Sequence, residues 1–308
     1  MLTVADRDLF EFAAAHHSVF SLAEAAAAGL TEPQIRFRAA HFWVRRYDGV
    51  FRMAGAAPSW RGDLRAATLA AGHGAAISHR SAAAIYELPS GRHDVTELTT
   101  PRWDRSVRPG LIVHESRRLD TADIREVDGI PVTTPELLLL HLAALRPSAN
   151  YIEMIIHAAR RKHLITYAST RQTFDRHARR GLTGTRALRI ALDRWDPSQR
   201  PTESEMETML LQAIRSHGLR EPVLQFEVHD ARGAMVGRVD AAYPEAFLAI
   251  EYDSMQEHSD EFQLARDARR RNAIAAAGYL TLSARNTDLR RGGVELCEQI
   301  ARIIRRSA

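Results

Sequence analysis

The stretch RVDAAYPEAFLAIEYD, residues 238–253, decides the fold of the C-terminal third of the chain. It contains two runs of β-branched, aromatic and small apolar residues, separated by the turn-forming pair Pro244-Glu245. This pattern predicts two neighbouring strands, Val236–Ala242 and Phe247–Asp253, which pair through the turn.

Acidic residues in these strands form a candidate chemical centre. Residues two apart in a strand share a face, so Glu251 and Asp253 point the same way, and pairing through the turn brings Asp240 close to Glu251. Neighbouring carboxylates repel unless a cation lies between them, and carboxylate oxygens suit Mg²⁺ or Mn²⁺. Such an ion activates water and neutralises charge on a phosphodiester. Glu207 supplies a further carboxylate, and His258 follows the second strand closely.

The elements around these strands follow the order α, β, β, β, α, β, α. A helix begins at Ser204, where Ser204 and Glu207 have the spacing of a capping box, and it ends at Gly218. The other predicted elements are a strand at Val223–Val228, a helix at Phe262–Ala277, a strand at Tyr279–Ser283 and a final helix after Gly293. We assign all of them to one domain, residues 201–308.

This order and its motifs resemble the PD-(D/E)XK nuclease superfamily, and more closely the DUF559 group, relatives of very-short-patch repair endonucleases. The resemblance covers about residues 202–308. The matching residues are Ser204, Glu207, Gln225, Arg238-Val-Asp240, Ile250-Glu-Tyr-Asp253, His258, Asp267, Arg270 and Gly278-Tyr279.

The resemblance implies a restriction-endonuclease-like αβββαβ domain with specific residue roles. Asp240 and Glu251 would hold the metal, Asp253 and Glu207 would assist, and His258 would lie near the scissile phosphate. Asp253 stands where most of the superfamily has lysine, although the closer relatives accept an acidic residue there.

The first 55 residues show a second recognisable pattern. Capping boxes at Ser21–Glu24 and Thr31–Gln34 begin two helices that follow an initial helix at Asp6–His16. Asp48-Gly49 then separates two β-rich runs, which is a strong hairpin signal. Helix, helix, turn, helix and hairpin together predict a winged helix-turn-helix DNA-binding domain over residues 1–55.

Basic residues follow the third helix and the hairpin of this domain, which predicts contact with DNA. Side chains of the helix are expected in the major groove and those of the hairpin on phosphates. The predicted DNA-binding residues are Gln34, Arg36, Arg38, Arg45, Arg46 and Arg52, joined by Arg270 beside the nuclease-like centre. The other interpretation is a solvated basic face on a winged helix that binds protein.

Residues 58–200 form an α/β middle region that becomes helical. The hairpin Arg45–Arg52, the stretch ISHRSAAAI at residues 77–85 and the strand Gly129–Thr134 resemble AbiEi-type antitoxins of type IV toxin–antitoxin systems. That resemblance implies a transcriptional repressor that binds its own operator, with a cognate toxin as a partner. Ser78-His79 has the residue types of a nucleophile and a base, but adjacent side chains seldom face each other, so we predict no catalytic role for the pair.

The overall composition limits the compartment and the chemistry. The net charge of +4 and the pI of about 9.5 are compatible with a nucleic-acid partner without requiring one. Cys297 is the only cysteine, which excludes an intramolecular disulfide and a Cys-based zinc site. The chain shows no signal peptide and no apolar run that would span a bilayer, so we expect a cytoplasmic protein without membrane contact.

The sequence therefore predicts a multidomain α+β or α/β protein: a winged helix-turn-helix, a mixed α/β middle region and an αβββαβ restriction-endonuclease-like domain. Two functions follow. The first is a Mg²⁺- or Mn²⁺-dependent endonuclease that hydrolyses phosphodiesters of double-stranded DNA. The alternative is an AbiEi-like antitoxin and repressor whose nuclease-like domain is inactive.

Overall fold

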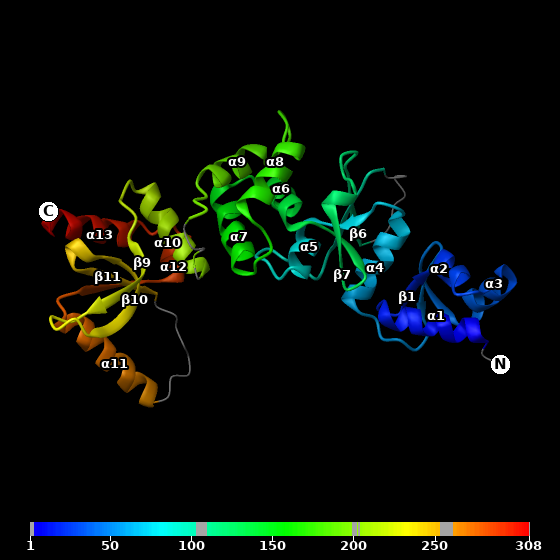
Figure 1. Cartoon of the computed structure of the whole chain (residues 1–308), viewed down its shortest axis with the longest axis horizontal. Helices are drawn as coiled ribbons and strands as arrows, with labels where there is room; N and C mark the ends of the chain where they lie inside the picture. Colours follow the sequence, from blue (N-terminus) through cyan, green and yellow to red (C-terminus); the bar gives the residue numbers. More distant parts are fainter. Residues whose placement is uncertain (1–2, 103–109, 199–201, 203, 253–260, 308) are drawn as a thin grey trace. The chain divides into compact units, whose positions relative to one another are not determined.

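The computed structural model describes residues 3–102, 110–198, 202, 204–252 and 261–307, with only the backbone at 261–265. The described chain is a mixed α/β protein with three sheets (Figure 1). Its contacts divide it into two compact units, residues 1–199 and 200–308. None of the helices within these described residues is long and apolar enough to cross a membrane.

The first unit begins with three helices and a small sheet of strand order β1-β3-β2. Glu24 accepts from the Ser21 backbone N–H at 2.7 Å and Ser21 Oγ accepts from the Glu24 N–H at 3.2 Å, which is the predicted capping box. The short strand β1 was not predicted, because three residues are too few to show the alternation of apolar and polar residues typical of a strand. The elements are α1 (Val4–Ala15), β1 (Val19–Ser21), α2 (Leu22–Ala27), α3 (Glu32–His41), β2 (Trp43–Tyr47) and β3 (Val50–Met53).

A second sheet follows in the same unit, with strand order β6-β5-β4-β8-β7. Its strands are short, and β4 and β7 were not predicted. The elements are α4 (Trp60–Ala71), β4 (Ala76–Ile77), α5 (His79–Ile85), β5 (Thr96–Thr100), β6 (Leu111–Glu115), a 3₁₀ turn (Thr121–Asp123), β7 (Ile124–Val127) and β8 (Ile130–Thr133).

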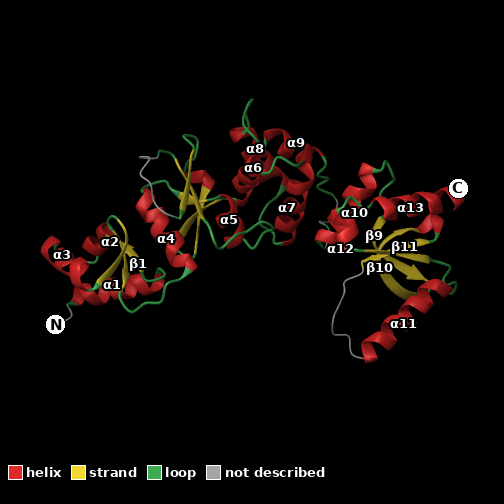
Figure 2. Cartoon of the chain, turned by 180° about the vertical axis from the view of Figure 1, so that it is seen from behind, coloured by secondary structure: helices red, strands yellow, loops and turns green. Residues whose placement is uncertain are grey.

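Four helices complete the first unit and bury its largest apolar core. Leu138, Leu139 and Leu142 of α6 are fully buried in this core together with Ile152 and Ile155 of α7. The helices are α6 (Pro135–Leu145), α7 (Ala149–Arg161), α8 (Tyr167–His177) and α9 (Thr185–Asp193). Figure 2 shows them as a helical group beside the second sheet.

One glycine permits the close approach of α9 to α6. Gly184 caps α9 with φ of +86°, and a Cβ at this position would lie 2.4 Å from the carbonyl carbon of Ala143. Such a distance is far inside van der Waals contact, so only glycine fits without a shift of one helix.

Helix α4 packs on both sheets of the first unit. Its Ala66 is buried with Val19 and Val50 of the small sheet, whereas its Leu64 and Ala67 belong to the large core of the second sheet. The two sheets therefore share one helix.

Arg65 of α4 is a buried cation at this junction, with 6% of its surface exposed. Its guanidinium donates to Val19 O at 3.2 Å, to Gly129 O at 2.6 Å and to Glu24 Oε1 at 2.6 Å. Burial lowers the pKa of Arg65, and the nearby charge of Glu24 opposes that shift. One side chain thus links β1, α2 and the β7–β8 turn.

The second unit contains a four-stranded sheet of order β12-β11-β10-β9, in which β11 and β12 are parallel and the other neighbours antiparallel. Its element order is the one expected from the sequence, with an additional short helix. The elements are α10 (Glu205–Ser216), β9 (Val223–His229), β10 (Met235–Tyr243), a 3₁₀ turn (Pro244–Ala246), β11 (Leu248–Tyr252), α11 (Glu261–Ala276), β12 (Leu280–Ala284), α12 (Asn286–Arg290) and α13 (Val294–Ser307).

Helices cover both faces of this sheet. Leu248 and Ile250 of β11 pack against α10, α12 and α13 on one face of the sheet. On the other face, Ile274 of α11 packs against Val239 and Ala249. Figure 1 shows α11 and α13 on opposite sides of the strands.

Candidate functional site

Asp240 and Glu251 lie on the neighbouring antiparallel strands β10 and β11 of the second unit. In the antiparallel register, Ala241 pairs with Ile250. Asp240 precedes the first of these residues and Glu251 follows the second, directly beyond the last paired residues of the two strands. The turn at residues 244–246 pairs the two strands as expected from the sequence.

Each of the two carboxylates already has a protein partner. The backbone N–H of Tyr252 donates to Asp240 Oδ2 at 2.8 Å. Arg270 Nη1 of α11 donates to Glu251 Oε1 at 2.7 Å and to Arg238 O at 3.0 Å. The Glu251 side chain is 15% exposed, so this ion pair is partly shielded from solvent. The sequence did not predict that an arginine would compensate Glu251.

Glu207 occupies a buried position at the beginning of α10. Ser204 Oγ accepts from the Glu207 N–H at 3.1 Å, which is one half of the predicted capping box. The carboxylate itself accepts a hydrogen bond from Gln225 Nε2 on β9. A carboxylate held in this way is positioned by a neighbouring strand as well as by its own helix.

Tyr252 lies between these acidic groups and the core. Burial raises the pKa of its phenol, and the negative charges of Glu207 and Asp240 raise it further. Among the described residues its buried hydroxyl has no hydrogen-bond partner. A neutral, uncompensated hydroxyl beside two carboxylates marks this region as polar and incompletely satisfied.

The remaining two predicted residues, Asp253 and His258, lie outside the described residues. Within the described part of the chain, no group of three or more His, Cys, Asp or Glu side chains could hold a metal ion. The available donors are the oxygens of Asp240 and Glu251. Their chemistry fits a hard divalent cation, but Arg270 competes for one Glu251 oxygen.

In the first unit, the predicted DNA-binding side chains differ in exposure. Arg36 of α3 is 76% exposed and pairs with Glu32, one helical turn before it, at 2.7 Å. Gln34 Oε1 accepts from the Thr31 N–H at 2.9 Å, so its amide oxygen takes part in capping α3. The guanidinium of Arg36 is therefore exposed to solvent on the surface of α3.

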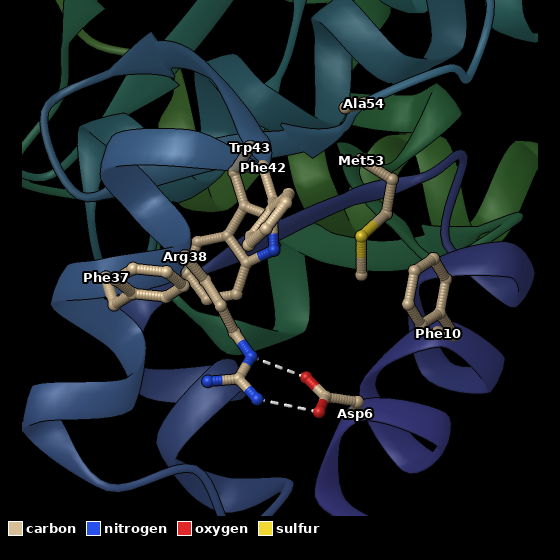
Figure 3. Close-up of a pocket in the computed structure, with 8 residues that line it drawn as sticks. All are labelled: Asp6, Phe10, Phe37, Arg38, Phe42, Trp43, Met53 and Ala54. Carbon is tan, nitrogen blue, oxygen red and sulfur yellow. Dashed lines mark hydrogen bonds and ion pairs between the residues drawn. The ribbon is translucent and has the colours of Figure 1, made fainter. Parts of the chain in front are cut away.

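Arg38 instead joins α3 to α1. Its guanidinium donates to both oxygens of Asp6, at 2.5 and 2.7 Å, and only 15% of the side chain is exposed. The hydrogen bonds from Arg38 hold the pKa of the Asp6 carboxyl well below its usual range. Figure 3 shows this pair at the edge of an open pocket of about 450 Å³. The pocket is lined by Asp6, Phe10, Phe37, Arg38, Phe42, Trp43, Met53 and Ala54.

The hairpin presents its arginines along an edge strand. Arg45 and Arg46 of β2 are exposed, the first paired with Asp48 and the second with Asp63 at 2.6 Å. Arg52 of β3 donates to the carbonyl oxygen of Ala56. Arg45 and Arg46 are thus solvated, whereas Arg52 has a backbone partner.

The sequence reasoning missed a cluster of histidines in the first unit. Ser78 Oγ lies 2.8 Å from His79 Nδ1, although the two residues are adjacent in sequence. His79 has a φ of +51° at the beginning of α5, an uncommon left-handed conformation for a residue other than glycine. His114 and His141 lie against its ring. These residues are separated by tens of positions and share no motif spacing, so no sequence signal joined them.

The chain is similar to proteins of Mycobacterium tuberculosis, and no known protein-family profile matches it. An uncharacterized protein, Rv2248, of strain ATCC 25618 / H37Rv is 27% identical over 264 residues, which span 86% of this chain and 93% of the relative. MT2308 of strain CDC 1551 / Oshkosh, also uncharacterized, matches to the same extent.

Among solved structures, the crystal structure of the RV2827C protein from M. tuberculosis aligns with 76% of this chain and 87% of its own, at 15% identity. The TM-score of 0.36 is too low to support an argument about fold or function.

Proposed function

We propose that this protein binds double-stranded DNA through α3 and the β2–β3 hairpin, which together with α2 form a winged helix-turn-helix. The exposed arginines of this segment carry the proposal. Residues 31–53 contain five arginines against two acidic residues. Such an excess of positive charge on a helix and an adjacent strand suits the phosphate backbone of DNA.

The existing partners of these arginines do not prevent DNA contact. Arg36, Arg45 and Arg46 pair with surface carboxylates, and exposed pairs of this kind contribute about 0–1 kcal/mol. A phosphate can replace such a partner at small cost. In this arrangement Arg36 faces the major groove and the two β2 arginines contact phosphates. Arg38 and Arg52 support the fold through Asp6 and Ala56, so we leave them out of the proposed surface.

The test is fluorescence anisotropy of the full chain with duplexes taken from the region upstream of its own gene. We expect Arg36→Ala to weaken binding about tenfold, and the double variant Arg45→Ala/Arg46→Ala to reduce the slope of log K against log salt by about 2. Arg7→Ala is the matched control, because Arg7 is a 68% exposed arginine on α1 in the same unit. Equal affinity and equal salt slope in all variants would exclude this surface.

A second candidate function is metal-dependent hydrolysis of DNA phosphodiesters by the second unit. The specific observation that favours it is that Asp240 and Glu251 lie on paired neighbouring strands of an αβββαβ core, the arrangement implied by the resemblance to the PD-(D/E)XK superfamily. These two side chains would hold Mg²⁺ or Mn²⁺, and the ion would supply an activated water. Arg270 would then leave Glu251 and become available to a phosphate of the bound strand.

Plasmid cleavage and metal binding test this candidate separately. We expect Asp240→Ala and Glu251→Ala to abolish cleavage and to weaken Mn²⁺ binding measured by calorimetry, whereas Arg270→Ala should strengthen Mn²⁺ binding because a competitor is removed. Glu227→Ala, an exposed carboxylate on β9, serves as the control. Cleavage that persists in both acidic variants would reject the site. Metal-independent DNA binding without any cleavage would instead favour the antitoxin and repressor alternative, with a cognate toxin or the operator as partner.

A further inference from the structure

Three imidazole rings form a stacked column inside the first unit. The ring centroids of His79 and His114 are 3.6 Å apart with an interplanar angle of 18°, and those of His79 and His141 are 4.4 Å apart at 6°. The rings come from α5, β6 and α6, so three separate segments of the fold contribute to the column. A cavity of about 170 Å³ adjoins it, and all three rings line this cavity.

The three histidines of the column cannot coordinate one metal ion together. A ligating imidazole holds its ion in the ring plane at about 2.0–2.1 Å from the nitrogen. Parallel rings whose centroids are 3.6 Å apart have separate planes, so His79 and His114 cannot direct their lone pairs to one ion.

Hydrogen bonds hold the His79 ring, and burial keeps it neutral. Thr99 Oγ1 donates to Ser78 Oγ at 2.8 Å, and Ser78 Oγ lies 2.8 Å from His79 Nδ1. Ser78 Oγ can accept from both Thr99 and the ring or donate to the ring, so this contact fixes the position of the His79 ring. Burial, followed by the neighbouring histidines, lowers the pKa of His79 far below its ordinary value, and burial lowers that of His141 to about 3. Both rings are therefore neutral donors at neutral pH.

Two further ring nitrogens lack hydrogen-bond partners among the described residues. His141 Nδ1 and His114 Nε2 are both buried and unsatisfied. The nearest carboxylate oxygen to His114 Nε2, Glu97 Oε1, lies 3.8 Å away, beyond hydrogen-bond range. These two nitrogens are therefore available to hydrogen-bond a group bound in the cavity.

Positive charge exceeds negative charge at the cavity. Arg118 and Arg179 line it, against the single carboxylate of Glu115. The buried acids nearby are already compensated, since Glu97 pairs with Arg80 at 2.7 Å and Asp123 with His177 at 3.0 Å. Thr183, just before the first turn of α9, also lines the cavity, and the N-terminus of this nine-residue helix adds partial positive charge.

We propose that this cavity binds a phosphate group, either as inorganic phosphate or as the phosphate of a mononucleotide. Guanidinium, imidazole and hydroxyl donors surround a space with few acceptors, which suits a tetrahedral anion with several oxygens. The volume of about 170 Å³ accommodates such a group, whereas pockets for whole drug-sized molecules start at about 300 Å³.

The test is calorimetric titration of the full chain, in a phosphate-free buffer at constant ionic strength, with inorganic phosphate, adenosine monophosphate and adenosine. We expect both phosphate compounds to bind and adenosine not to bind. Tighter binding of the mononucleotide identifies a nucleotide as the source of the group, and equal binding identifies free phosphate. Binding of adenosine as tight as that of its monophosphate, or no binding of either phosphate compound at about 10 mM, overturns the proposal.

Two pairs of arginine variants distinguish phosphate binding in the cavity from attraction of phosphate by the surface charge in general. Arg118→Gln and Arg179→Gln should each weaken phosphate binding about tenfold, the factor expected for one charge-assisted hydrogen bond. Arg117→Gln and Arg180→Gln remove the same charge from neighbouring exposed positions outside the cavity and should leave affinity unchanged. Equal losses in both pairs, or no loss in the first, contradict the assignment.

His141→Phe provides an independent readout at the column itself. Phenylalanine preserves a flat stacked ring but has no nitrogen, so phosphate binding should fall while circular dichroism shows an unchanged fold. Full retention of phosphate binding in this variant would show that the histidine column does not contribute to the phosphate site.

Discussion

Replacement of Arg65 by methionine would remove the buried cation of α4 while keeping much of its apolar volume. Arg65 donates to the carbonyl oxygens of Val19 and Gly129 and to the carboxylate of Glu24. The variant leaves these three acceptors without their donor in the interior of the first unit.

The magnitude follows from these contacts. Removing one member of a buried ion pair costs about 3–5 kcal/mol, because the remaining charge is left uncompensated. Glu24 is 25% exposed and keeps its capping hydrogen bond from Ser21, so solvent and the backbone relieve part of that cost. We therefore expect a loss of about 3 kcal/mol in the free energy of unfolding, toward the lower end of that range.

Tryptophan fluorescence in urea measures this loss in the relevant part of the molecule. All four tryptophans of the chain lie within residues 1–199, so their emission reports the first unit alone. With an m-value of about 3 kcal/mol/M, the midpoint should fall by about 1 M.

Arg61→Met is the matched control, since Arg61 lies one helical turn before Arg65 and pairs with Asp128 at the surface. Exposed pairs contribute about 0–1 kcal/mol, so its midpoint should hardly move. A result in which Arg65→Met and Arg61→Met lose the same small free energy would refute the argument that the buried contacts hold the two sheets together.

Three other results follow from the structure. Gly184→Ala should destabilise the first unit by more than about 3 kcal/mol in urea titrations, because its Cβ would collide with Ala143. The control Gly181→Ala should cost about 1 kcal/mol, because Gly181 has the same sign of φ but open space around it. Similar losses in both variants would contradict the close approach of α9 to α6. The first unit should lose stability as the pH falls from about 6.5 toward 3, because His141 takes up a proton in the unfolded chain before it does so in the folded chain. His141 contributes at most about 1.4 kcal/mol of this loss per pH unit. His141→Phe should flatten the dependence of unfolding free energy on pH, and an unchanged slope would reject a lowered pKa for His141. Cys297 is buried and burial raises the pKa of its thiol, so it should react with a thiol reagent only when urea unfolds the second unit, and rapid labelling without urea would show that α13 opens locally.

Much of the fold could be predicted because local signals agreed with the tertiary structure. The box of Ser21 and Glu24 begins α2, and the Asp48-Gly49 pair joins β2 to β3 as expected. Strands β1, β4 and β7 were missed, because runs of two to four residues show no alternating pattern without a turn signal beside them. Strand β4 pairs with β5 and β8, and β7 pairs with β8, which only the tertiary structure reveals.

The pairing of the two strands that carry Asp240 and Glu251 could be predicted, because one turn joins them. The strands β10 and β11 are adjacent in sequence and pair through the turn at residues 244–246. The ion pair of Glu251 with Arg270 depends on how α11 packs across the sheet, and no residue spacing reports that. The contact of Ser78 with His79 was dismissed as improbable for neighbours, although it forms where His79 adopts a positive φ.

Because α4 contributes to the cores of both sheets, the exposed connection at residues 54–58 is a poor place to separate them. A protease that nicks the backbone there should yield two fragments that still elute together from a sizing column, held by the contacts of Ala66 with Val19 and Val50 and of Arg65 with Glu24. A recombinant fragment that stops at residue 55 would expose the apolar side chains of Val19 and Val50, and it should aggregate.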